Sequence, residues 1–212
     1  CDIESNDYSG FDKAVNMAKK ADKIIMVLGE DYNMSGEAAS RTNIKLPGIQ
    51  TQLIKTIRDE LPNKPIVLVL MNGRPLDLTI EDSLADAILE VWYPGTSGGL
   101  GVADILFGKY NPSAKLPITF PRNLGQVPIY YNQKNTGRPI SKENPTEDYK
   151  SNYIDSPNTP LYPFGHGLSY TTFKYSEIKL SSDKVEESEI LKASSTITNS
   201  GDYDGHEIVQ LY

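Results

Sequence analysis

The sequence predicts an α/β protein with a mostly parallel sheet and helices on both faces, followed by a truncated antiparallel β-sandwich segment. Two observations over residues 10–120 predict the sheet. Strand-length apolar runs alternate with stretches of helical spacing, and these runs are continuously apolar, as in parallel strands buried on both faces. A third observation predicts the antiparallel part: apolar and polar residues alternate from about residue 168 onward.

The individual elements of the α/β part follow from these patterns. Strands are expected at the four apolar runs, over 23–28, 65–71, 85–92 and 115–120. Helices are expected where apolar residues recur every three or four positions, over 11–21, 47–61 and 97–107. Pro47 suits the second of these helices because a first helical turn tolerates proline.

The remainder of the chain divides into a loop and a set of short strands. Residues 121–165 are rich in Pro, Asn, Tyr and Gly and have little periodicity, which indicates a functional or wrapping loop. Strands are expected over 173–180, 193–199 and 207–212, too few to close a sandwich. The predicted organisation is therefore an α/β sandwich domain over 1–120, a long loop or linker over 121–167, and a partial β-sandwich over 168–212.

Composition narrows the classes of partner. The 212 residues carry a formal net charge of -7, which argues against a nucleic-acid groove lined by Lys and Arg. No apolar run is long enough to predict a membrane span. Cys1 is the only cysteine, so no intrachain disulfide is expected. We expect Cys1 to mark a fragment boundary rather than a lipidated residue, because no flexible tether follows it.

The candidate site lies in a loop of small residues after the 23–28 strand. This loop holds Glu37 and Arg41, and ligands bind at the carboxyl ends of strands in open α/β sheets. Taken alone, this segment favours a solvated surface Glu37. Glu30 and Asp31 end the strand and could hold the loop through its backbone N–H groups. Arg74, after the 65–71 strand, could equally pair with a nearby carboxylate in a turn or lie at the ligand edge.

Other chemistries find little support. Gly95–Gly101 lies between a strand and a helix, but its spacing matches neither a dinucleotide fingerprint nor a P-loop, so a tight turn is favoured. His166 and His206 are the only histidines, and no nucleophile elbow occurs, which argues against a triad and a metal site. Trp92 ends an apolar run and is expected in the core.

A series of short sequence motifs resembles, in order and spacing, those of the multidomain β-glucosidases of glycoside hydrolase family 3. The motifs run through nearly the whole chain: 27–30, 35–37 with 41, 46–54, 72–75, 92–95, 103–108, 110–117, 120–121, 162–171 and 196–201. The most specific are Asn-Pro-Ser-x-Lys-Leu-Pro at 111–117 and Pro-Phe-Gly-x-Gly-Leu-Ser-Tyr at 163–170.

The resemblance implies an α/β sandwich followed by a fibronectin type III-like domain, and a retaining, exo-acting enzyme that hydrolyses terminal β-D-glucosyl residues. It implies an N-terminal barrel of the same polypeptide, absent from this chain, that carries the nucleophile and most sugar contacts. Glu37 matches the general acid/base, whereas Ser35, Arg41 and Arg74 would bind substrate or support the loop. No metal or cofactor is implied. The expected substrate is a β-glucoside or oligosaccharide, and the expected location is periplasmic or secreted.

The acid/base loop departs from the family pattern. Many relatives read Gly-Glu-Gly-x-Asp-Arg where this chain reads Gly-Glu-Ala-Ala-Ser-Arg over 36–41. Glu30 or a barrel carboxylate therefore remains an alternative to Glu37. Two further alternatives stay open: a non-catalytic carbohydrate-binding or interaction module, in which Glu37 and Arg41 would be dispensable, and a flavodoxin-like domain that binds a nucleotide at Gly95–Gly101.

Overall fold

The computed structural model describes residues 3–140 and 148–212, which form two compact units. The first unit comprises Cys1–Gly99 and Leu116–Phe164, and the second comprises Leu100–Lys115 and Gly165–Tyr212. Cys1 itself lies outside the described residues. The domain limits at residues 120 and 167 remain predictions.

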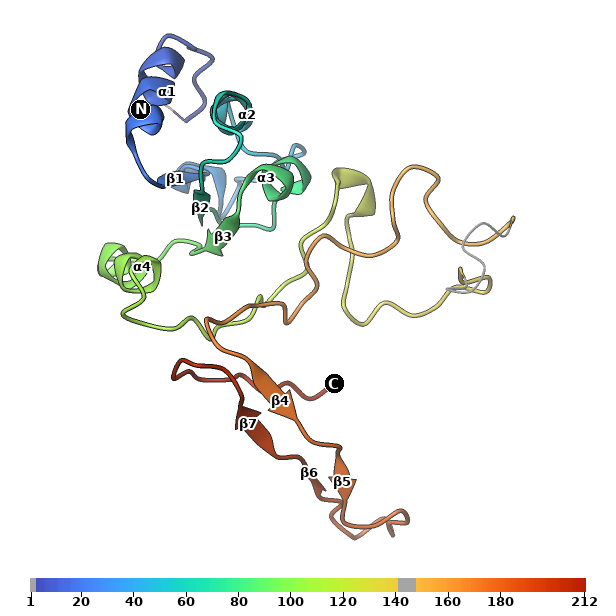
Figure 1. The fold of residues 1–212 in the computed structure, drawn as a ribbon. Coiled ribbons are helices and arrows are strands. Elements are labelled where there is room, and N and C mark those ends of the chain that lie inside the picture. The colour runs from blue at the N-terminus through green and yellow to red at the C-terminus, as the bar shows by residue number, and fades with distance from the viewer. Residues whose placement is uncertain (1–2, 141–147) are drawn as a thin grey trace. The chain divides into compact units, whose positions relative to one another are not determined.

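A parallel three-stranded sheet organises the first unit (Figure 1). Its strands are β1 (Ile24–Gly29), β2 (Ile66–Met71) and β3 (Ala87–Glu90), in the order β1-β2-β3. Ile24 pairs with Ile66, and Leu70 pairs with Glu90, so the carboxyl ends of all three strands meet at one edge. The α/β class with a parallel sheet is confirmed.

Helices connect these strands. The α-helices are α1 (Phe11–Lys20), α2 (Gln50–Glu60), α3 (Thr79–Leu84) and α4 (Gly98–Leu106), with single 3₁₀ turns η1 (Tyr32–Met34) and η2 (Leu124–Gln126). α2 packs against both α1 and α3. α1 buries Val15 and Ala18, and α2 buries Ile54 and Ile57, because helical spacing gathers these side chains on one face of each helix.

The core of the first unit lies under β2, the central strand. Ile66, Leu68 and Leu70 are completely buried there. β1 differs from its prediction as a strand buried on both faces: Ile25 is 46% exposed and Val27 is 60% exposed, while Ile24 and Met26 on the other face are buried. An edge strand whose second face has no cover within its own unit exposes alternate side chains.

Two expectations for the first unit were wrong. The strand over 115–120 does not form: only Phe120 pairs, in an isolated antiparallel bridge to Tyr162. Pro117 and Pro121 lack the N–H groups that a longer ladder needs. The expected elements also omit α3, because its six residues are too few for a helical period to be recognised.

The second unit contains short antiparallel pairs. β4 (Phe173–Tyr175) pairs with β7 (Ile197–Asn199), and β5 (Lys179–Leu180) pairs with β6 (Ala193–Ser194). The antiparallel prediction for these segments is confirmed. The strand expected over 207–212 is absent, because the backbone of this segment finds no pairing strand within the described part of the chain.

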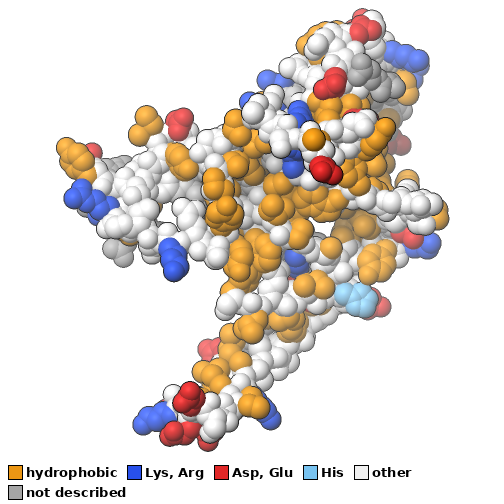
Figure 2. All heavy atoms as spheres, turned by 180° about the vertical axis from the view of Figure 1, so that it is seen from behind, with side chains coloured by type: hydrophobic (Ala, Val, Ile, Leu, Met, Phe, Trp, Pro, Cys, Tyr) orange, Lys and Arg blue, Asp and Glu red, His pale blue; other side chains and the backbone are white. Residues whose placement is uncertain are grey.

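The surface exposes many large apolar side chains, some of which are visible on the face drawn in Figure 2. Ile25 and Val27 of β1 belong to this set, as do Tyr130 and Ile154 of the long loop. None of the helices in the described ranges has the length and hydrophobicity that a bilayer crossing requires.

Candidate functional site

The site is built where β1 ends. Gly29 has a φ of 151°, and a Cβ there would lie 1.8 Å from the carbonyl oxygen of Met71, so only glycine allows the strands to approach this closely. The buried Gln50 amide accepts from Gly29 N and donates to Gly29 O, both at 2.8 Å. These contacts fix the backbone that carries the next residue, Glu30.

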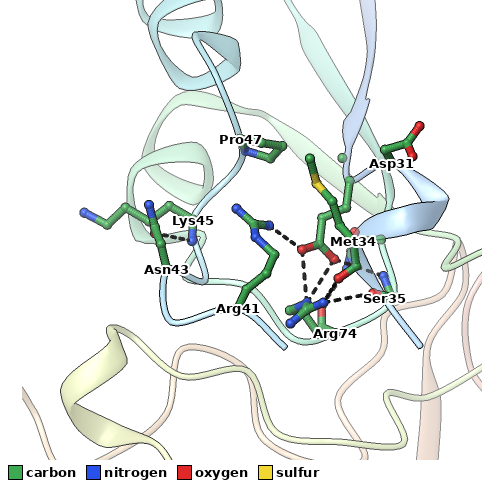
Figure 3. Close-up of polar contacts among 12 residues, drawn as sticks. Asp31, Met34, Ser35, Arg41, Asn43, Lys45, Pro47 and Arg74 are labelled. Carbon is green, nitrogen blue, oxygen red and sulfur yellow. Dashed lines mark hydrogen bonds and ion pairs between the residues drawn. The ribbon is translucent and has the colours of Figure 1, made fainter. Parts of the chain in front are cut away.

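Glu30 is a fully buried carboxylate held by two arginines, Arg41 and Arg74. Both arginines are labelled in Figure 3. Arg41 donates from Nη1 to Glu30 Oε1, and the same oxygen lies 3.0 Å from Arg74 Nε. The backbone N–H of Gly73 donates to Oε2 at 3.3 Å. A carboxylate without solvent needs such charged partners, because burying it unpaired would cost several kcal/mol, roughly.

Arg74 also braces the loop that follows Glu30. Its Nη2 donates to the carbonyl oxygen of Met34, to Ser35 Oγ at 3.2 Å and to the carbonyl oxygen of Ala39 at 3.0 Å. Figure 3 shows Arg74 beside Met34 and Ser35. One guanidinium therefore binds the chain on both sides of residues 36–38.

Glu37 lies at the tip of this braced loop. The N–H of Ala39 donates to Gly36 O at 3.3 Å, so residues 36–39 form a tight turn with Glu37 at a corner. Gly36 and Ala38 flank it with φ values of 112° and 59°. Ala38 thus occupies a left-handed conformation, which costs about 1 kcal/mol for a residue other than glycine. Glu37 is exposed and makes no hydrogen bond or ion pair with another described residue.

Gly73 forms the surface on which the loop rests. A Cβ at Gly73 would lie 2.3 Å from Ser35 Oγ and 2.8 Å from a ring carbon of Tyr93. Tyr93 donates its hydroxyl to Asp31 O at 3.0 Å, and Asp31 accepts from Asn33 N at 3.0 Å. The expectation that Asp31 holds the loop by a backbone N–H is confirmed.

A second acidic residue, Glu90, ends β3 at the same edge of the sheet. Burial raises the pKa of Glu90 to about 7, and the nearby charge of Glu30 acts in the same direction. The N–H of Trp92 donates to Oε1 at 2.9 Å, which opposes that shift. Among the described residues, neither Glu90 Oε2 nor the Oδ1 of the fully buried Asn72 has a hydrogen-bond partner.

The structure brings four predicted residues into one network: Glu30, Ser35, Arg41 and Arg74. This network holds the loop on which Glu37 lies, but Glu37 itself makes none of the network's hydrogen bonds or ion pairs. Of the two alternatives left open for Arg74, the structure shows the pairing with a nearby carboxylate, through its contact with Glu30.

Sequence reasoning missed the part played by Gln50 and Glu90. Glu90 carries the same signal that singled out Glu30, since both end an apolar strand at the ligand edge. Gln50 gives no such signal, because its role depends on a contact 21 residues away along the chain.

The two structural expectations near the site hold. Gly95 has a φ of 70° and accepts from Gly98 N at 3.1 Å, which confirms a turn. A Cβ at Gly98 would lie 2.4 Å from the Pro94 ring, so this glycine permits close packing. Trp92 packs on the core, with its ring centroid 5.8 Å from that of Phe120.

Comparison with known proteins identifies the fold. The model of the glycosyl hydrolase family 3 C-terminal domain matches residues 4–170. A periplasmic beta-glucosidase of Salmonella typhimurium is 53% identical over 201 residues, which cover 95% of this chain and 26% of the relative. A beta-xylosidase of Formosa agariphila is 38% identical over 212 residues, covering 100% of this chain and 28% of the relative.

Solved structures agree with this result. The beta-glucosidase from Listeria innocua in complex with gluconolactone superposes with a TM-score of 0.91 and 39% identity, covering 97% of this chain and 28% of that protein. A family 3 beta-glucosidase of Bifidobacterium adolescentis has a TM-score of 0.73 and 30% identity, covering 96% of this chain and 30% of that protein. The chain thus spans between a quarter and a third of the length of these relatives, and it belongs to glycosyl hydrolase family 3, whose C-terminal domain it contains.

Proposed function

We propose that this chain supplies the general acid/base of a retaining, exo-acting β-glucosidase, and that Glu37 is that residue. The observation that carries the proposal is the exposed Glu37 carboxylate at the tip of a braced loop, at the ligand edge of a family 3 sheet. A general acid must reach the leaving oxygen of a substrate that arrives from outside this domain. An exposed side chain can reach that oxygen, and a backbone fixed by hydrogen bonds keeps the side chain in position.

Glu30 is the alternative candidate for the acid/base within this chain, and its surroundings favour Glu37 instead. Both oxygens of Glu30 accept from guanidinium or backbone N–H groups, and its side chain has no exposed surface. A carboxylate held in this way cannot approach a glycosidic oxygen without breaking two ion pairs. Glu30 therefore suits a structural role.

The chemistry requires a second carboxylate. Retaining glycosidases place a nucleophile and an acid/base about 5 Å apart, and the acid/base first protonates the leaving group and then activates water. We assign the nucleophile to an N-terminal barrel of the same polypeptide, outside this chain. The exposed Ile25 and Val27 support a further protein surface against this unit, because such apolar patches favour contact with protein.

Substrate and location are proposed from the relatives. A terminal β-glucoside is favoured because the Salmonella and Listeria relatives are beta-glucosidases, and a β-xyloside is the second candidate because the Formosa relative is a beta-xylosidase. The Salmonella name also supports a periplasmic or secreted location. The ratio of kcat/KM for matched aryl β-glucosides and β-xylosides would decide between the two sugars.

The test of Glu37 is azide rescue of Glu37→Ala in the full-length protein. An activated aryl β-glucoside needs little acid help, so the glycosyl-enzyme should form and its hydrolysis should stall, by about 100-fold or more. Azide needs no general base and should restore turnover with a β-glycosyl azide as product. The matched control is Glu60→Ala on α2, an exposed glutamate that pairs only at the surface with Lys19.

The outcomes separate the alternatives. Rescue by azide in Glu37→Ala, with Glu60→Ala unaffected, supports the assignment. Near-normal turnover of Glu37→Ala without azide would transfer the role to a different carboxylate and reduce the loop to a structural element.

A further inference from the structure

We propose that Arg74 is a positioning residue for Glu37: its guanidinium holds the loop so that the carboxylate meets the leaving oxygen. This inference rests on the proposed function of Glu37. It assigns to Arg74 a task in proton transfer that acts through the loop backbone and requires no contact with the sugar.

The donor geometry of Arg74 carries the argument. Nε faces Glu30 at 3.0 Å, while Nη2 donates to Met34 O, Ser35 Oγ and Ala39 O. The acceptors on residues 34 and 39 bracket the turn that holds Glu37. A planar guanidinium offers donors in fixed directions, so it fixes these two segments relative to each other.

Glu30 fixes Arg74 in turn. Its buried carboxylate binds Arg74 from the β2–α3 connection and Arg41 from the far end of the loop. The Glu30–Arg41 pair joins the first and last residues of the 30–41 loop, and Arg74 braces its middle. The loop is therefore closed at its base and supported inside, although the residues on either side of Glu37, over 35–36 and 38–40, are small and contribute little packing.

Positioning matters because proton transfer depends steeply on geometry. A displacement of about 1 Å in a reacting group can cost about 100-fold in rate. The tip offers few other constraints: Glu37 has no hydrogen bond or ion pair within the described ranges, so its placement depends on the backbone beneath it.

The experiment compares Arg74→Lys with Arg58→Lys in the full-length protein. Arg58 is a matched control, since its side chain is 17% exposed against 19% for Arg74, and it also binds a carboxylate and several carbonyl oxygens. It lies away from the loop, on α2, where it holds Leu84 O and Lys64 O. Lysine keeps the charge at both positions but loses the planar set of donors.

The readout is the dependence of rate on the leaving group. For Arg74→Lys, kcat/KM should fall by about 10- to 100-fold with an alkyl β-glucoside, which needs acid help, and by less than about threefold with a dinitrophenyl β-glucoside. Arg58→Lys should change both substrates by the same small factor. In the Glu37→Ala background, with the activated substrate and azide, Arg74→Lys should add no further loss, because the acid it positions is absent.

Each contrary result has a distinct meaning. An equal loss for both substrates, or a higher KM with the leaving-group dependence unchanged, would overturn the positioning role and indicate substrate binding or general support. If Glu37→Ala lacks azide rescue, the proposed function fails first; if rescue occurs but Arg74→Lys is unselective, only the present inference fails. Ser35→Ala removes one acceptor of Arg74 with little risk to folding and should show the same selective loss, several-fold in size, even if Arg74→Lys does not fold.

Discussion

Two glutamates at the same edge of the sheet show how single-residue surroundings divide roles between identical side chains. Glu30 follows β1 and meets two guanidinium groups, whereas Glu90 ends β3 and meets the backbone N–H of Trp92 and the side chain of Asn72 but no cation. Burial without a cation favours the neutral acid, which is why the pKa of Glu90 rises to about 7. A proton on Glu90 Oε2 would turn one of the two buried acceptors that lack a hydrogen-bond partner among the described residues into a donor.

At this scale we predict that Glu90→Gln removes a pH-dependent loss of stability. The pKa of Glu90 is about 7 in the folded chain and 4.5 ordinarily, so the folded state binds more protons between these values. Glu90 therefore costs no stability below pH 4.5, and the free energy of unfolding falls as the pH rises to 7, by up to about 3 kcal/mol. Glutamine keeps the shape and cannot ionise, so the variant should be more stable at pH 8.

The measurement is hydrogen exchange of the β2 and β3 amides in the full-length protein, corrected for the intrinsic exchange rate at each pH. Glu187→Gln is the control, because Glu187 is exposed in the second unit and should leave the profile unchanged. Identical pH profiles for Glu90→Gln and the unaltered protein would contradict the prediction.

The sequence predicted part of this residue-scale picture. The end of an apolar strand located Glu30, and the family motifs aligned Glu37 and Arg41. The shared Glu30 carboxylate between Arg41 and Arg74 could not be read from the chain, because it joins residues 11 and 44 positions apart. Such contacts depend on strand register, which a single sequence leaves open.

At the scale of elements, the connection after β2 supports the loop after β1. Gly73 allows Ser35 and Tyr93 to approach its backbone, and Arg74 then binds the loop from beneath. Parallel neighbours with the same register place these two connections side by side. The ligand edge of the sheet is thus one packed assembly of two connections.

We predict that Gly73→Ala displaces the loop and lowers catalysis selectively. The new Cβ would lie 2.6 Å from Ser35 Cβ, a backbone-near atom that cannot simply rotate away. Overpacking of this kind costs about 1–3 kcal/mol. We expect kcat/KM for an alkyl β-glucoside to fall by about tenfold or more, with a smaller loss for an activated aryl glycoside.

Gly101→Ala on α4 is the matched control, because nothing lies within 4 Å of its added Cβ and alanine favours a helix. Adding Ser35→Gly to Gly73→Ala removes the Ser35 atoms that collide, although the Tyr93 contact remains and Arg74 loses an acceptor, so it should recover only part of the activity. Equal activity of Gly73→Ala and Gly101→Ala would show that the loop does not rest on Gly73 during turnover.

Elements were predicted where periodicity was long. α1, α2 and α4 and the three parallel strands were expected close to their observed bounds. α3 was missed because six residues are too few to show a helical period and because Leu78, at its N-cap, makes no side-chain capping bond. The failed strand over 115–120 shows the opposite error, since apolar content without free N–H groups does not make a ladder.

At the scale of the whole molecule, the proposed function assigns this chain one of the two carboxylates of a catalytic pair. The chain spans between a quarter and a third of the length of its relatives, and the acid/base that we propose lies on an exposed tip. In the second unit, the Asn111 side chain joins two other segments: its Nδ2 donates to Asp204 O, and its Oδ1 accepts from Ser169 Oγ and Tyr170 N. Such contacts order that unit.

We therefore predict that the 212-residue chain alone has no glycosidase activity above background, even with an activated aryl β-glucoside. A lone carboxylate in water can neither form a glycosyl-enzyme in place of the nucleophile nor gain the raised pKa that a buried acid acquires beside a second carboxylate. Folding must be verified first, and Trp92 allows this: it is the only tryptophan, and its partly buried ring should give blue-shifted fluorescence that urea abolishes. Turnover by the folded chain that disappears in Glu37→Ala would mean that both catalytic groups lie within these residues, and the assignment of the nucleophile to a barrel outside the chain would then be wrong.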